Sequence, residues 1–106
     1  MIYDANSIDI IGKRYDGGLD LYIISSGSID ASPETQTLLL DKVENYLGYV
    51  SSKEFKKAFP GIRPEAVNIV FQIEEEPPRE LLMLCERIIP WAKDYGVTFL
   101  IKRQSL

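Results

Sequence analysis

Residues 67–73, with the sequence VNIVFQI, decide the fold. Apolar residues recur at every second position of this stretch, which is the period of a β-strand. Helical patterns lie on both sides of it along the chain. A strand that is reached and left through helices runs parallel to its neighbours, and such crossovers are right-handed. The stretch therefore predicts an inner strand of a sheet. One of its faces carries Val67, Ile69, Phe71 and Ile73, and the other carries Asn68, Val70 and Gln72.

The helix before this strand is predicted over residues 33–50. Ser32 is a favourable N-cap, and Pro33 suits the first helical position. The helix is expected to end near Ser51. Apolar residues at helical spacing predict a buried face, made of Leu39, Val43, Tyr46, Leu47 and Val50. Polar residues are expected mostly opposite that face: Asp41, Lys42, Glu44 and Asn45.

Two further helices complete the helical part of the prediction. Residues 51–59 favour a short helix, because Ser51 and Glu54 have the spacing of a capping box. Residues 77–96 favour a longer helix that contains Pro90 and ends at Gly96. The predicted core face of this helix comprises Leu81, Leu84, Cys85, Ile88, Ala92 and Tyr95.

The N-terminal part predicts an antiparallel hairpin of Ile8–Lys13 with Leu19–Ser25, because the DGG sequence at residues 16–18 supplies the positive φ angles of a tight turn. Residues 97–103, VTFLIKR, predict the last strand. The order is strand, strand, helix, short helix, strand, helix, strand. We therefore expect a single α+β domain over residues 1–106, with a four-stranded mixed sheet and all helices on one face.

The face of the sheet without helices is predicted to be too apolar for a fully solvated surface. Such a patch indicates a binding partner, because monomeric proteins seldom expose a large contiguous apolar area. The predicted partner is a protein, with a homodimer as one form. The candidate interaction face comprises Tyr22, Ile24, Val70, Gln72, Leu100 and Lys102.

The loop SSGSIDAS, residues 25–32, is the second candidate site, with Ser26, Ser28 and Asp30 as its candidate residues. A phosphate-binding loop needs several glycines, usually with a lysine, before a helix. This loop has one glycine, no lysine and an acid at the place an anion would occupy. We expect a connection rather than a site. Binding of a small molecule or an anion, by this loop or by the sheet face, remains the alternative function.

Composition narrows the functional classes. The chain has no histidine, which removes the commonest general base and the commonest zinc ligand. We predict no catalytic residue, no metal site and no cofactor. The net charge of −4 opposes binding to nucleic acid or to an anionic membrane. A single cysteine, Cys85, fits a reducing cytoplasm and is predicted to lie in the core.

Several stretches carry a resemblance to a known family. They are SIDIIG at residues 7–12, YIIS at 22–25, LLLDKVENYLGYV at 38–50 and VNIVFQIEEEPP at 67–78. With them the chain resembles a family of small bacterial proteins classed as a domain of unknown function. The resemblance implies a shared fold and no established activity. The family tends to carry an Asp–Trp pair before its first helix, whereas this chain has Asp30 followed by Ala31.

The residues together favour a non-enzymatic domain for protein–protein interaction or regulation, which associates with itself through the open face of the sheet.

Overall fold

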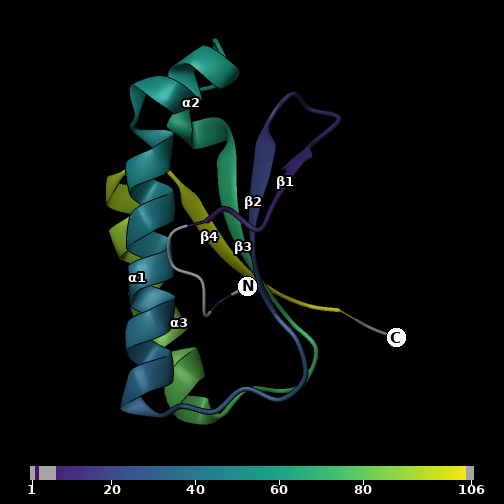
Figure 1. Cartoon of the computed structure of the whole chain (residues 1–106), viewed down its shortest axis with the longest axis vertical. Helices are drawn as coiled ribbons and strands as arrows, with labels where there is room; N and C mark the ends of the chain where they lie inside the picture. The colour runs from purple at the N-terminus through teal and green to yellow at the C-terminus, as the bar shows by residue number, and fades with distance from the viewer. Residues whose placement is uncertain (1, 3–6, 105–106) are drawn as a thin grey trace.

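The computed structural model describes residue 2 and residues 7–104 of the chain. Figure 1 shows a mixed sheet with two long helices beside it. The four strands are ordered β1-β2-β3-β4. The elements, in chain order, are β1 (Ile10–Lys13), β2 (Leu19–Ser25), α1 (Pro33–Val50), α2 (Lys53–Ala58), the 3₁₀ turn η1 (Pro64–Ala66), β3 (Val67–Ile73), α3 (Arg79–Asp94) and β4 (Thr98–Arg103).

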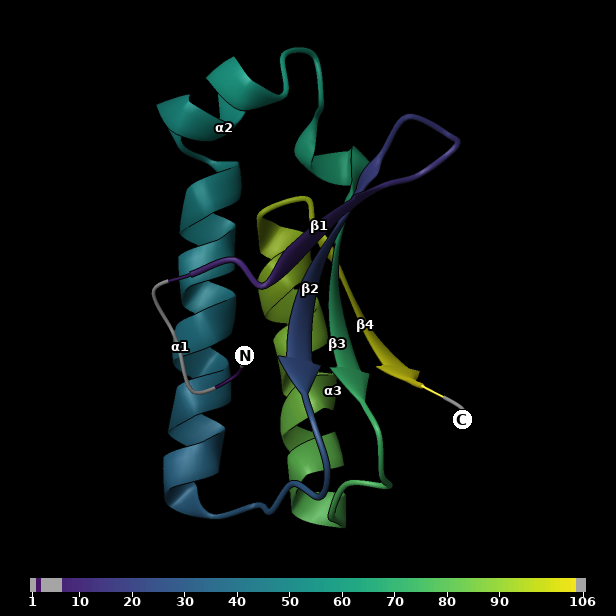
Figure 2. The same cartoon turned by 45° about the vertical axis from the view of Figure 1, so that its right-hand side comes forward.

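The pairing of the strands confirms the predicted α+β fold. β1 runs antiparallel to β2, whereas β2, β3 and β4 are parallel. The two β-α-β connections place α1 and α3 on the same side of the sheet, as Figure 2 shows. The other side of the sheet is left without helices. This asymmetry gives the sheet one face that belongs to the core and one open face.

The hairpin between β1 and β2 differs from its prediction at both ends. Strand β1 begins at Ile10 rather than Ile8. Of the three turn residues 16–18, only Gly17 has a positive φ, 90°. Gly18 is required for space, because a Cβ there would lie 1.9 Å from Nη2 of Arg14 and 2.5 Å from the carbonyl oxygen of Ala66. Gly18 therefore leaves room for the Arg14 guanidinium, and it does not supply a positive φ to the turn.

Helix α1 begins and ends as its sequence predicts. The hydroxyl of Ser32 accepts a hydrogen bond from the Thr35 amide at 3.2 Å, and Pro33 follows at the first helical position. The predicted apolar face is buried in full. One polar residue departs from the prediction, because Lys42 is also buried on this helix, with 0% of its surface exposed.

The second and third helices each correct one residue of the prediction. Ser52, not Ser51, caps α2, and its hydroxyl accepts from the Phe55 amide at 3.1 Å. In α3 the core face is buried except for Tyr95, which is about half exposed because it lies past the last helical turn. Gly96 has a φ of 82° and ends the helix as expected.

The core lies between the sheet and the helices. Its sheet side consists of alternate residues from β2 and β3, and Leu19, Leu21, Ile69 and Phe71 are nearly inaccessible. Cys85 is buried among these side chains, and burial raises the pKa of its thiol to about 11. Within the described part of the chain, no helix has the length and apolar character needed to cross a membrane.

Candidate functional site

The open face of the sheet carries one continuous apolar row. Ile10 pairs with Tyr22, Tyr22 with Val70, and Val70 with Leu100, so the row crosses all four strands. Paired residues of adjacent strands point to the same face of a sheet. The two ends of the row are accessible, with 51% of Ile10 and 43% of Leu100 exposed. We call these four residues the apolar row.

The centre of the apolar row is less accessible than its ends. Val70 is only 4% exposed, although it lies on the helix-free side. Its cross-strand neighbours Tyr22 and Leu100 flank it in register. Val70 is therefore largely buried within the protomer, and a charge at this position would disturb the protomer itself.

Two further rows of paired residues border the apolar row, and each of them contains polar side chains. Asp20, Asn68 and Thr98 are in register on one side, and the Asn68 amide donates to the Asp20 carboxylate at 3.0 Å. On the other side lie Ile24, Gln72 and Lys102, also in register. The six residues predicted for the interaction face thus share one surface. Ile10 was missed, because the sequence does not show which residue of the first strand pairs with Tyr22.

The loop of residues 25–32 holds the start of α1. The Asp30 carboxylate accepts hydrogen bonds from the Ser32 amide at 3.1 Å and from the hydroxyls of Ser32 and Thr35. The Thr35 hydroxyl is the main cause that lowers the pKa of Asp30 below its ordinary value. Since this carboxylate already occupies the positive end of the helix, an anion there would be repelled. Ser26 and Ser28 are exposed on the same loop.

The acidic run at residues 74–76 also has structural partners. Glu74 accepts a hydrogen bond from the Gly27 amide at 2.7 Å, and Glu76 forms an ion pair with Arg103 at 3.4 Å. Within the described residues, no group of three or more acids, cysteines or histidines is placed to hold a metal ion. The lysines of α2 (Lys53, Lys56 and Lys57) and the nearby Arg63 are exposed.

A buried polar cluster, which the sequence analysis missed, closes the outer edge of β2. The Lys42 ammonium donates to the Asp9 carboxylate at 2.8 Å and to the Ser7 carbonyl at 2.7 Å. The same carboxylate accepts from the Ile24 amide at 3.0 Å. The Tyr46 hydroxyl accepts from the Asp9 amide at 3.0 Å and donates to the Tyr22 carbonyl.

The ionisation of this cluster follows from its contacts. Burial alone would raise the pKa of Asp9, but the hydrogen bonds from Lys42 and Ile24 and the Lys42 charge outweigh it, so the pKa is lowered. Burial is also the main cause that raises the pKa of Tyr46. A signal for the cluster exists in the sequence, since Lys42 lies four residues before Tyr46 and borders the apolar face.

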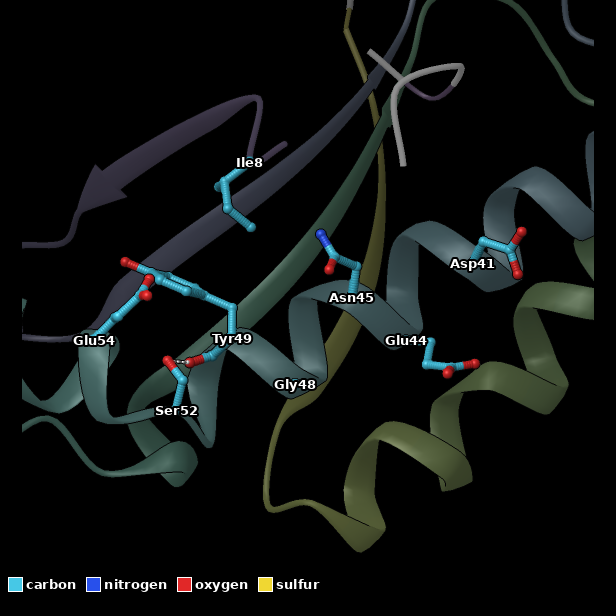
Figure 3. Close-up of a pocket in the computed structure, with 8 residues that line it drawn as sticks. All are labelled: Ile8, Asp41, Glu44, Asn45, Gly48, Tyr49, Ser52 and Glu54. Atoms are coloured by element: carbon cyan, nitrogen blue, oxygen red, sulfur yellow. Dashed lines mark hydrogen bonds between the residues drawn. The ribbon is translucent and has the colours of Figure 1, made fainter. Parts of the chain in front are cut away.

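A groove of about 670 Å³ lies on the outer side of α1. Figure 3 shows its lining side chains, which come from α1, from the start of α2 and from Ile8. Asp41, Glu44 and Glu54 make the lining acidic, and Tyr49 is its aromatic member. The Ser52 hydroxyl at one end donates to the Tyr49 carbonyl at 2.6 Å. Three carboxylates oppose an anionic ligand here, as Asp30 does in the loop.

Comparisons with known proteins complete these observations. Neither the curated proteins nor the solved structures gave a match to the chain. A family model described as "Family of unknown function (DUF6572)" matches residues 1–105, nearly the whole chain. On that match, the chain belongs to the DUF6572 family.

Proposed function

We propose that this chain is a non-enzymatic protein-interaction domain and that it associates with a second copy through the open face of the sheet. The apolar row carries the proposal, because it crosses every strand on the side without helices and its ends are exposed. The rows on both sides contain polar side chains, and this mixture fits an interface that is apolar at the centre and more polar at the rim. A symmetric dimer is the commonest way in which soluble proteins cover such a face.

The chemistry of the side chains supports a role without catalysis. The sequence contains no histidine. Asp30, the acid that follows Ser26 and Ser28 in the sequence, is held by the first turn of α1. The thiol of Cys85 is buried, and its raised pKa keeps it protonated at neutral pH. One cysteine cannot form an intramolecular disulfide, which supports a reducing cytoplasm as the compartment.

Light scattering at micromolar concentration tests the self-association. We expect the wild-type chain to have a mass above one protomer and the Ile10→Glu variant to lose the association across the open face. Ile10 is the residue of choice because it is the most exposed member of the apolar row. Circular dichroism checks that the variant stays folded.

The matched control is Met83→Glu, which places the same charge on an equally exposed apolar residue of α3, away from the sheet face. This control is expected to keep the wild-type mass. A wild-type chain that is monomeric, or an Ile10→Glu variant of unchanged mass, would contradict association through the open face.

A further inference from the structure

We infer that the free edge of β4 pairs antiparallel with β4 of a second copy, which joins the two sheets into one of eight strands. The inference goes beyond the proposed function, because it concerns the edge of the sheet and not its open face. It stands on the direction of the backbone groups of β4, on one symmetric register and on the side chains that lie beside the edge.

The backbone of β4 presents three residues outward. The Gln104 amide donates to the Ile73 carbonyl at 2.8 Å, so this residue bonds to β3. Residues of a strand alternate between its two edges, and therefore Phe99, Ile101 and Arg103 direct their amide and carbonyl groups away from β3. Among residue 2 and residues 7–104, none forms a backbone hydrogen bond with these outward groups. Such an edge is a template for another strand.

One symmetric register uses all three outward residues. It is centred on Ile101, which then faces Ile101 of the second copy. Phe99 faces Arg103 of the second copy, and the reciprocal pair forms by symmetry. A centre at Arg103 would set two like charges opposite each other, which is destabilising. In the register centred on Ile101, Lys102 lies opposite Leu100 of the second copy. The charges of Lys102 and Arg103 therefore permit the register centred on Ile101 and disfavour the register centred on Arg103.

Exposed apolar side chains flank the edge on both faces of the sheet. Leu100 lies on the open face, and Ile101, which is 39% exposed, lies on the helix side. Ile89 of α3 is about half exposed. Arg87 of α3 lines a cavity together with Gln36 of α1, so Arg87 marks the flank of α3 that faces α1. At 100° per residue Ile89 points to the opposite flank, away from α1. A second copy at the edge would cover the side chains of β4.

Ile101→Pro tests the pairing, because proline removes an outward amide without taking a hydrogen bond from β3. We expect this variant to have half the wild-type mass by light scattering, with unchanged circular dichroism. The result is independent of the open face: Ile10→Glu abolishes only association across that face, whereas Ile101→Pro abolishes only association at the edge. A folded Ile101→Pro variant with the wild-type mass would overturn the inference.

A cross-link gives a second readout that does not depend on how well proline is tolerated. Directly paired residues in the hydrogen-bonded register have Cα atoms about 5.5 Å apart, a separation that a disulfide spans. Ile101→Cys should therefore form a covalent dimer under mild oxidation. The exposed control Met83→Cys should remain monomeric in the gel. An Ile101→Cys variant that cross-links no faster than this control would overturn the inference.

Discussion

The two edges of the sheet differ in whether their outward backbone groups have hydrogen-bond partners. At the β1 side, the short outer strand leaves part of β2 unpaired, and side chains from the segment before β1 and from α1 take over its hydrogen bonds. Asp9 binds the Ile24 amide, and Tyr46 binds the Tyr22 carbonyl. At the β4 side, the outward backbone groups of Phe99, Ile101 and Arg103 have no such partners among the residues that the structure describes.

From this difference we predict that the closed edge contributes to stability and that the open edge is the site of the inferred association. The closed edge buries an ion pair and a phenol, whose loss would be costly because desolvated polar groups depend on their partners. The open edge carries Lys102 and Arg103, which discourage indiscriminate strand pairing. Substitutions at the closed edge should therefore change the free energy of unfolding, and substitutions at the open edge should change the oligomeric state.

Asp9→Ala is expected to have the largest effect on the closed edge. It removes the carboxylate of a buried ion pair and leaves the Ile24 amide without its acceptor. Breaking a buried pair from one side costs about 3–5 kcal/mol. Urea denaturation measures the change in the free energy of unfolding. The control Asp41→Ala removes an exposed acid and should change it by less than about 0.5 kcal/mol. Equal effects would show that the cluster does not hold the edge.

Gly18→Ala should have the second largest effect, at the other end of the same edge. The added Cβ would collide with the Ala66 carbonyl and with the guanidinium of Arg14, which donates to that carbonyl at 2.9 Å. Overpacking of this kind costs about 1–3 kcal/mol.

The control for this change is Gly48→Ala in α1, where a Cβ meets no atom within 4 Å. Alanine in place of a helical glycine should stabilise by up to about 1 kcal/mol. Thermal unfolding should therefore shift in opposite directions for the two variants. A shift in the same direction would contradict the role given to Gly18.

A change of pH should give the smallest effect and should sharpen the comparison. The pKa of Asp9 is lowered in the folded state, so the unfolded state binds more protons near that pKa. Its contribution is fully present above the ordinary carboxyl pKa and is lost as the pH falls through the lowered value. The stability gap between the wild type and Asp9→Asn should consequently narrow on acidification from pH 7 to pH 3. A gap that stays constant would assign the effect to packing alone.

Local patterns predicted the elements that depend on local chemistry. The bounds of β3 and the cap and end of α1 agree with the sequence, because the two-residue period and the Ser32–Pro33 signal need no distant partner. The residues of the candidate face could also be predicted, because side chains alternate along β2, β3 and β4 and this alternation assigns each residue to one face of the sheet.

The features that escaped prediction depend on residues far apart in the chain. Lys42 is buried because Asp9, 33 residues away, neutralises it, and no local pattern around residue 42 contains that partner. Ile10 joins the apolar row only through the register of the hairpin, which its five-residue connection sets. Ser51 and Ser52 are both good caps, and the choice between them depends on how α2 leaves α1.

The hydrogen bond between the Ile24 amide and the Asp9 carboxylate gives this protein a local probe of its own dynamics. An amide held by a side chain of another segment exchanges its proton with solvent whenever that segment detaches, without global unfolding. The amides of β3, which are paired on both sides, exchange only through larger openings. The ratio of the two exchange rates, each corrected for its intrinsic rate, therefore measures how much less free energy the detachment of the segment around Asp9 requires than the opening of β3.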